Sequence, residues 1–554
     1  MKNLLAKPLL RSRYTLAIIA GLLWAASFPK IGLAALAWVA PALMLAAALG
    51  TSGAERFRIG YVAGLAHYLA SLHWLLLIPY RWHGIPLGPG AGWIALSAYL
   101  ALYPAAWVWM VSTSQPSTPP WKMEDGRWKS GSHIPYPIPH ILYPIRGAAF
   151  WVALEMIVGR LFSGFPWNLL GASQYQLTPL IQIASVTGIY GVSFLVVWVS
   201  LSLMSAALMV IRRPAHARMC GVGEVILPIL AVSVAFGLGY RHLRQDSPAD
   251  RTLRVTFVQP NVPQTVIWDS TKNQERFQQL IRLSEEGLTK QPALLVWPEA
   301  AVPTLVRYDK ETFEAVTTLA RTHHLWMIVG ADDAERRPNA AKPDEADYFN
   351  SSFLISPEGR LVGTYRKQNL VILGEYVPRW LPFLKYFTPI EGGFTPGNTA
   401  VTFELTNLEV KTSVLICFED VFPHVARQAA REDTDFLVNL TNNGWFGEGA
   451  AQWQHAAGAL FRAIENDLPL LRCSNNGLTC WVDARGRLRQ LFQDKQGSVY
   501  GAGVMTADIP LLALGEKRRP TFYHQHGDGF GWGCVGVTAL TLAWRLARRN
   551  KFAP

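Results

Sequence analysis

Cys417 ends an apolar run in the segment VLICFEDVFP, and two carboxylates, Glu419 and Asp420, follow almost at once. Nearby negative charge raises the pKa of a thiol and keeps it protonated, whereas a nucleophilic cysteine reacts as the thiolate. This cysteine is therefore either an inert residue of the core or a nucleophile that a base and a cation from elsewhere in the chain activate.

Two other segments contain such groups. Glu299 ends the run LLVWPEA, and Lys367 lies in YRKQNLVILGEYVP. Functional side chains of α/β sheets gather at the carboxyl ends of strands, which suits Glu299 and Cys417. A lysine lowers the pKa of a thiol and later holds a developing oxyanion, while a glutamate takes and returns the proton. The three residues predict an acyl-transfer site, although a structural cysteine in a buried strand fits the spacing equally well.

The elements that must position these residues are short runs rich in β-branched residues, which alternate with amphipathic stretches. Strands are expected at 253–259, 293–299, 326–331, 412–419 and 435–441. Helices are expected at 272–289 and 310–323. The alternation predicts an α/β domain over residues 250–515 whose sheet is covered by helices.

The first 245 residues have a different character. Of the whole chain 50% is hydrophobic and only 16% is charged, against roughly 25% charged residues in soluble domains. Apolar runs near the length of about 20 residues that a membrane span needs occur at 14–29, 31–50, 59–79, 91–112, 147–163, 180–211, 224–240 and 529–547. We expect seven spans within residues 1–245 and an eighth at 529–547. The first run is interpreted as an uncleaved span, because further apolar runs follow at once.

Lysine and arginine indicate the orientation of these spans. They gather in the termini and in one set of short loops, whereas the other short loops have only Lys30, Arg81 and Arg160. The rich side is expected to be cytoplasmic. Both termini, the basic tail 548–554 and the Pro-, Ser- and Lys-rich insertion 113–140 would then face the cytoplasm, and residues 250–515 would lie outside it. This topology explains the net charge of +12 without nucleic-acid binding.

Three segments resemble the signature of the nitrilase (carbon–nitrogen hydrolase) superfamily: VWPEAAVP (296–303), the Lys367 stretch with GEYVP (374–378), and ICFED (416–420). Together with the spans, they make the whole chain similar to the apolipoprotein N-acyltransferase family. SGFPWNLLGASQ (163–174) and NNGWFGEGAAQWQH (442–455) are further matches. The resemblance implies an αββα sandwich next to an α-helical polytopic membrane domain of about eight spans.

The resemblance also implies roles for individual residues. Cys417 would be the nucleophile, Glu299 the general base and Lys367 the group that stabilises the oxyanion. The residues implied to support the site are Glu375, Glu419, Trp268, Trp167 and Phe418. Phe418 stands where the family usually has tyrosine, and Ile372 and Leu373 replace the Pro-Phe that the family usually has before Gly-Glu.

The implied reaction transfers a fatty acyl group from a phospholipid, with phosphatidylethanolamine the expected donor, to the α-amino group of the N-terminal S-diacylglyceryl-cysteine of an apolipoprotein. It runs through a Cys417 thioester in a bacterial inner membrane, with the catalytic domain in the periplasm and with no cofactor or metal. Two alternatives remain: a membrane-anchored amidase that acts on a lipid amide, and a transporter or scaffold with a degenerate outer domain.

Several other residues allow two interpretations each. Glu155 lies inside an apolar run, where it would be functional or paired with a residue such as Arg160. His455 would either reach the active site or have a packing or supporting role behind it. His524 and His526 are expected to be interfacial anchors rather than metal ligands.

Two further segments remain open. Cys473 and Cys480 flank Asn476-Gly477, a two-residue turn that would set them opposite each other at a hydrogen-bonded pair of positions. Such a pair suits a disulfide poorly, so none is expected. The aromatic stretch with Trp380 and 383–387 would be a lid that dips into lipid or a packed loop.

Overall fold

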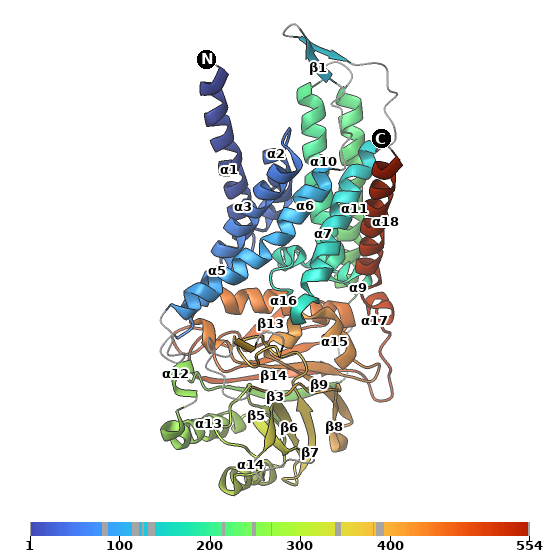
Figure 1. Cartoon of the computed structure of the whole chain (residues 1–554). Helices are drawn as coiled ribbons and strands as arrows, with labels where there is room; N and C mark the ends of the chain where they lie inside the picture. Colours follow the sequence, from blue (N-terminus) through green and yellow to red (C-terminus); the bar gives the residue numbers. More distant parts are fainter. Residues whose placement is uncertain are drawn as a thin grey trace.

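The computed structural model describes residues 2–79, 87–113, 121–124, 127–130, 139–212, 217–245, 251–267, 269–337, 345–379, 382–383 and 393–551. The chain forms a bundle of helices with layered sheets and helices at one end of it (Figure 1). Both chain ends lie in the helical half, away from the sheets.

The bundle contains long helices and several short ones. Its helices are α1 (Lys2–Ala26), α2 (Ala40–Ala47), α3 (Gly53–Ser71), α5 (Gly88–Leu100), α6 (Leu102–Thr113), α7 (Pro139–Val158), α8 (Thr178–Ile181), α9 (Ala184–Thr187), α10 (Ile189–Arg212), α11 (Ala217–Leu243) and α18 (Gly529–Lys551). Within the described ranges, four segments are long and apolar enough to cross a membrane, and these are Gly88–Ser112, Ile189–Met209, Glu224–Leu243 and Gly529–Ala547. The helical membrane domain is therefore confirmed, and the total of eight spans stays a prediction.

The run 31–50 is not the single continuous helix that a simple span would form, although it still returns the chain along the bundle. α1 and α3 run parallel, with Tyr14 OH donating to Glu55 Oε1 at 2.8 Å and Trp24 stacked on His67, so the segment between them crosses back. That run forms the short 3-10 helix η1 (Ala34–Trp38) and α2, and a helix of eight residues reaches about 12 Å, less than half of the hydrocarbon core. Trp38 Nε1 donates to Gln174 Oε1 at 2.9 Å, and Ala42 N donates to Ser200 Oγ at 3.0 Å. These contacts hold the run against the loop before α8 and against α10, which itself begins nine residues later than the predicted 180.

The other half contains two six-stranded sheets. The first has the order β14-β3-β4-β5-β6-β7, with β14 (Gly503–Leu511), β3 (Arg251–Gln259), β4 (Leu294–Val296), β5 (Trp326–Arg336), β6 (Ala346–Ile355) and β7 (Leu361–Arg366). The second has the order β13-β12-β11-β10-β9-β8, with β13 (Leu488–Leu491), β12 (Cys480–Val482), β11 (Leu470–Ser474), β10 (Phe436–Thr441), β9 (Val410–Ile416) and β8 (Thr402–Leu405). Parallel pairs link β3, β4 and β5 in the first sheet and β9, β10 and β11 in the second.

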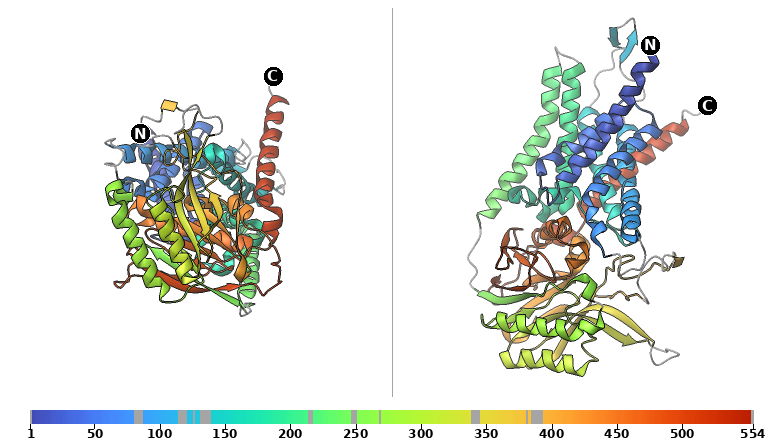
Figure 2. Two further views of the ribbon diagram at one scale, coloured as in Figure 1. Left: turned by 90° about the horizontal axis from the view of Figure 1, so that it is seen from below. Right: turned by 90° about the vertical axis from the view of Figure 1, so that its left-hand side faces the viewer.

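The sheets pack face to face around a core of aliphatic and aromatic side chains from both, such as Val255 and Ile328 opposite Val414 and Leu440. Helices α13 (Asn273–Leu288) and α14 (Lys310–His323) cover the outer face of the first sheet. Helices α15 (Pro423–Ala429) and α16 (Ala450–Asn466) lie between the second sheet and the bundle (Figures 1 and 2). The predicted αββα sandwich is confirmed, as are the five predicted strands and both predicted helices. The insertion 113–140 contains the hairpin of β1 (Trp121–Glu124) and β2 (Arg127–Ser130).

Gln454 of α16 fastens the sandwich to the bundle. Its Nε2 donates to Pro29 O at 2.9 Å and to Ser71 O at 3.1 Å. Its Oε1 accepts hydrogen bonds from Trp74 Nε1 at 3.1 Å and Trp167 Nε1 at 2.9 Å. One buried amide therefore joins the sandwich to the ends of α1 and α3 and to the loop after α7.

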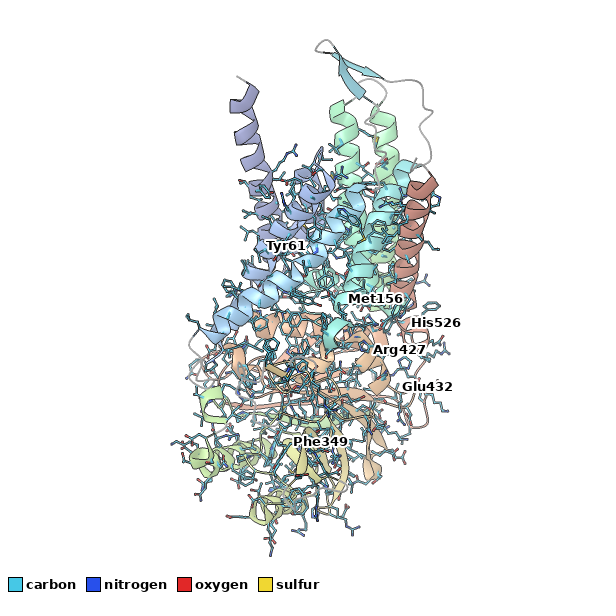
Figure 3. The ribbon with its side chains drawn as sticks, viewed as in Figure 1. Tyr61, Met156, Phe349, Arg427, Glu432 and His526 are labelled. Atoms are coloured by element: carbon cyan, nitrogen blue, oxygen red, sulfur yellow. The ribbon has the colours of Figure 1, made fainter. Side chains whose placement is uncertain are left out.

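A second fastening lies near the base of α18. Arg427 Nε donates to His524 O at 2.6 Å, and Arg160 forms an ion pair with Asp528. Figure 3 shows Arg427 and His526 together beside the end of the bundle, with Met156 just above Arg427. Arg160 is therefore the partner of Asp528, and the alternative that paired it with Glu155 is wrong.

Candidate active site

Cys417 lies where β9 ends and the 3-10 helix η8 (Cys417–Val421) begins. Its φ of 51° is in the left-handed region, a strained conformation for a residue other than glycine that is often found at active sites. Asn439 Nδ2, from the neighbouring strand β10, donates to Cys417 O at 3.0 Å and holds this turn. Cys417 as a whole residue is partly exposed.

Lys367 lies directly after β7 and meets two carboxylates. Its Nζ donates to Glu375 Oε1 at 2.8 Å and to Glu299 Oε1 at 3.4 Å. Asn350 Nδ2 of β6 donates to the same two oxygens, at 2.9 Å and 2.8 Å respectively. The ammonium is 1% exposed, so one buried cation and one amide hold two carboxylates in place.

The remaining carboxylate oxygens of this network are also hydrogen-bonded. Glu299 Oε2 accepts a hydrogen bond from Asn442 N at 2.9 Å, and Glu375 Oε2 accepts one from Val371 N at 2.8 Å. Each carboxylate is thus oriented by backbone on one side and by Lys367 on the other. A buried carboxylate with both oxygens satisfied is held rigidly, as the positioning of a base and an oxyanion-stabilising group requires.

The charges of this network act on the thiol. Burial alone would lower the pKa of Lys367, but Glu375 and Glu299 outweigh it and raise that pKa above its usual range. Burial and the negative charge of Glu299 raise the pKa of Cys417 to about 12, against the opposing effect of Lys367. The resting thiol is therefore protonated at neutral pH, and a base must take its proton as it attacks.

Glu419 contacts Gln368 and Asn369, which follow Lys367 and are called the lysine loop here, rather than the thiol. Its carboxylate accepts hydrogen bonds from Tyr365 OH at 2.8 Å, Gln368 N at 2.7 Å, Asn369 N at 3.1 Å and Ile416 N at 2.7 Å. Burial nevertheless raises its pKa above the usual range. Because these donors come from β7, from the loop after Lys367 and from β9, Glu419 fixes the two segments that position Lys367 and Cys417.

Three aromatic side chains, Phe418, Phe165 and Trp167, lie together beside the nucleophile and are called the aromatic wall here. The ring of Phe418 lies 6.0 Å from that of Trp167 and 5.8 Å from that of Phe165, which both belong to the loop after α7. The wall contains two of the predicted supporting residues. Trp268 lies outside the described residues, and so does the predicted aromatic lid except for Phe383, which is 53% exposed.

His455 and Asp420 belong to a buried network behind the nucleophile. His455 Nε2 lies 2.6 Å from Asp420 Oδ1, and its Nδ1 lies 3.1 Å from Asn443 Oδ1. Arg472 forms an ion pair with the other oxygen of Asp420. The carboxylate of Asp420 is therefore paired with Arg472 and His455. These contacts fit the supporting role of His455.

Glu155 has partners inside the bundle. Its Oε1 accepts hydrogen bonds from Trp151 Nε1 at 2.9 Å and from Leu170 N at 2.8 Å. It lines a small cavity together with Asn168 and Trp167. The carboxylate thus orients the loop that contains Trp167.

Cys473, Cys480, His524 and His526, which the sequence left open, have structural contacts. Cys473 and Cys480 are free thiols, as expected, but the predicted turn is wrong: five residues separate β11 from β12, and Cys480 pairs with Arg472 instead. His524 Nδ1 lies 2.9 Å from Asn466 Oδ1, and His526 stacks on Phe522 with ring centroids 4.0 Å apart. In the part of the chain that the structure describes, no group of His, Cys, Asp or Glu is arranged to hold a metal ion.

Asn350, Asn442 and Tyr365 are site residues that the sequence did not reveal. Asn442 follows the parallel strand β10, so its place at a strand end was a usable signal. Asn350 and Tyr365 lie inside strands, and only the packing of the sheets brings them to the site.

The sandwich and its strand-end cysteine define the class of protein: residues 254–519 match the carbon-nitrogen hydrolase family. A carbon-nitrogen hydrolase of known structure from Helicobacter pylori is similar at 18% identity and a TM-score of 0.35, over 47% of this chain and 89% of that one.

Residues 20–202 match the apolipoprotein N-acyltransferase N-terminal domain. The apolipoprotein N-acyltransferase of Geobacter metallireducens is 33% identical over 98% of this chain and 96% of that relative. The one from Methylococcus capsulatus is 30% identical over 97% and 96%. The chain belongs to the apolipoprotein N-acyltransferase family, a membrane-embedded acyltransferase branch of the carbon–nitrogen hydrolase superfamily, so the predicted family is confirmed.

Proposed function

We propose that this protein transfers a fatty acyl group from a phospholipid to the α-amino group of the N-terminal S-diacylglyceryl-cysteine of apolipoproteins, the last step of lipoprotein maturation. The observation that carries this proposal is the buried Lys367–Glu299–Glu375 network next to Cys417, in a chain related over its whole length to apolipoprotein N-acyltransferases.

In the first half-reaction, Glu299 takes the proton of the Cys417 thiol as the sulfur attacks the ester carbonyl of the phospholipid. The C–S bond forms, and the carbonyl oxygen becomes an oxyanion that Lys367 stabilises. When the intermediate collapses, the C–O bond breaks and Glu299 returns the proton to the leaving alkoxide. A thioester at Cys417 and a lysophospholipid result.

In the second half-reaction, the α-amine of the acceptor attacks the thioester carbonyl. The N–C bond forms, Glu299 takes a proton from the nitrogen, and Lys367 again faces the oxyanion. The C–S bond then breaks, because a thiolate is a good leaving group toward an amine. The sulfur regains its proton, and the product is a triacylated lipoprotein.

The proposal includes a donor, a place and an orientation. The donor is phosphatidylethanolamine, and the place is the bacterial inner membrane. Residues 1–245 and 529–547 form the membrane domain, residues 250–515 face the periplasm, and the 113–140 insertion and the 548–554 tail face the cytoplasm. The two chain ends, which both lie away from the sheets (Figure 1), support a common side for them.

Intact mass spectrometry tests the reaction. After incubation with phosphatidylethanolamine, we expect a fatty-acyl adduct on the wild type that neutral hydroxylamine removes. Cys417→Ala should have no adduct, and Cys480→Ala, which removes a buried thiol, should keep it. Addition of a diacylated lipopeptide should transfer the adduct to its amine.

Two results would contradict the proposal. Loss of the adduct to water at the same rate with and without lipopeptide would indicate the amidase-like hydrolase. No adduct from any phospholipid on the folded wild type would exclude a phospholipid as acyl donor.

A further inference from the structure

Asp332 faces the same side of the first sheet as the proposed base. Side chains alternate along β5: Ile328 belongs to the core between the sheets, and Val329 packs toward the outer helices. Asp332 therefore points toward the second sheet. Its partner across the β5–β6 register is Asn350, and directly opposite residues of an antiparallel pair share one face. Asp332 is partly exposed there.

Asn350 has an acceptor oxygen that lacks a donor. Its Nδ2 donates to both Glu299 and Glu375, which fixes the orientation of the amide and directs Oδ1 away from them. This Oδ1 is buried and accepts no hydrogen bond from the described residues, and Asn350 as a whole is 5% exposed. Phe349, the residue before it, lies within the sheet half in Figure 3. A buried acceptor without a donor is unfavourable by about 1–3 kcal/mol.

Asp332 also receives no hydrogen bond or ion pair from the described part of the chain, in contrast to Glu299 and Glu375. Burial and the charges of these two glutamates raise its pKa to about 7, Asp333 of its own strand adds to the rise, and Arg276 of α13 opposes it. Arg276 donates instead to Ile267 O. Two neighbouring acceptors, one of them a carboxylate, thus lie beside the proposed base without a donor.

We propose that Asp332 and Asn350 Oδ1 bind a primary ammonium group of a substrate. An ammonium has a positive charge and three N–H donors, which complement a carboxylate and a carbonyl oxygen. This inference rests on the proposed function, whose substrates offer two such groups: the α-ammonium of the acceptor and the ethanolamine ammonium of the donor head group. Asp332 is a binding residue in this assignment and takes no part in bond making. An acceptor bound as the ammonium loses one proton to solvent before it attacks as the free amine, and Glu299 takes the second proton after the N–C bond has formed.

Asp332→Asn tests the assignment, because it removes the charge and keeps the size. Glu335→Gln is the matched control: it removes a charge from the other face of the same strand, where Glu335 pairs with Arg366. Each variant is acylated separately with phosphatidylethanolamine and with phosphatidylglycerol, which has no amine. Loss of the adduct to a diacylated lipopeptide is then timed over a range of lipopeptide concentrations.

Two results support the assignment and distinguish the sources. A KM for the lipopeptide raised about tenfold in Asp332→Asn, with normal acylation by both lipids, identifies the acceptor amine. Slower acylation by phosphatidylethanolamine alone identifies the head group. In the first case the wild-type KM should rise as the pH falls from 8 to 6, because Asp332 loses its charge through its pKa of about 7, and Asp332→Asn should lack this part of the pH dependence.

Other results overturn it. Unchanged kinetics in Asp332→Asn would mean that no charge is needed at position 332. The asparagine amide, like a protonated Asp332, would then simply donate a hydrogen bond to Asn350 Oδ1. An equal loss with both lipids and the lipopeptide would indicate a structural role. If the wild type forms no adduct, the proposed function itself fails and the inference falls with it.

Discussion

The carboxylates of the candidate active site differ in their hydrogen bonds from two buried polar side chains of the bundle. In the sandwich, Glu419 and Glu299 have donors to both carboxylate oxygens. In the bundle, both ring nitrogens of His67 and both amide atoms of Asn168 are buried without a partner among the described residues. The contrast indicates that hydrogen bonding fixes the carboxylates of the site, whereas packing against neighbours such as Trp24 holds His67. Asp332 and Asn350 Oδ1 differ in this respect from the carboxylates of Glu299 and Glu375 beside them.

Glu299→Gln removes the proposed general base and has the largest expected effect on the reaction. The rate of acyl-enzyme formation should fall about 10³-fold, because the base is lost. Alkylation of Cys417 by iodoacetamide should nevertheless become several-fold faster, because burial and then the Glu299 charge raise the thiol pKa to about 12, and only the second cause is removed. Both rates are measured by intact mass.

The opposite responses of the two rates are the test of this prediction. In the wild type, alkylation should rise about tenfold per pH unit between pH 7 and 9, because the thiolate fraction does. Cys417→Ala gives the background from other thiols. A parallel fall of acylation and alkylation in Glu299→Gln would mean that the substitution only distorts the site.

Glu419→Gln tests the hydrogen bonds by which Glu419 holds the lysine loop. Either orientation of the new amide sets an NH₂ group against donors such as Ile416 N and Gln368 N. We expect a loss of about 3 kcal/mol in unfolding free energy, seen as a melting temperature several degrees lower in detergent. Glu285→Gln, on the exposed face of α13, should melt like the wild type. An unchanged melting temperature in Glu419→Gln would show that these hydrogen bonds do not contribute to the stability of the protein.

Gln454→Leu tests the contact between the sandwich and the bundle. It removes hydrogen bonds to Pro29 O, Ser71 O and two tryptophans, so we expect a loss of about 2 kcal/mol. Acylation from phospholipid should slow, because the wall with Trp167 loosens, while alkylation of Cys417 keeps its wild-type rate. Exposed Gln493→Leu is the control. A change in alkylation would mean that this contact also positions the thiol.

His67→Phe in the bundle should have the smallest effect. The ring stacks on Trp24 with centroids 3.5 Å apart, and phenylalanine can keep this stacking. Because an apolar ring has no buried nitrogens to satisfy, the melting temperature should stay equal or rise slightly. A clear fall would show that His67 has a bound partner such as water, and would remove its contrast with the carboxylates of the site.

The sequence located the strand-end residues well. Glu299 and Cys417 follow runs whose pattern predicted strands, and β4 and β9 end close to them. The 31–50 run shows the limit of the same reasoning. Apolar composition did not reveal that this run is divided into η1 and α2, and contacts such as Ala42 N to Ser200 Oγ, 158 residues away in sequence, fix its place in the bundle.

The sequence by itself determined the family, the two-part architecture and the three residues proposed for catalysis, because apolar length, strand pattern and short motifs are local properties of the chain. Tertiary structure alone decided that Asn350 joins Glu299 to Glu375, that Glu419 holds the lysine loop, and that Asp332 faces the site. These roles depend on sheet register and on carboxylates finding donors far away in sequence, and neither is encoded in the spacing of residues along the chain.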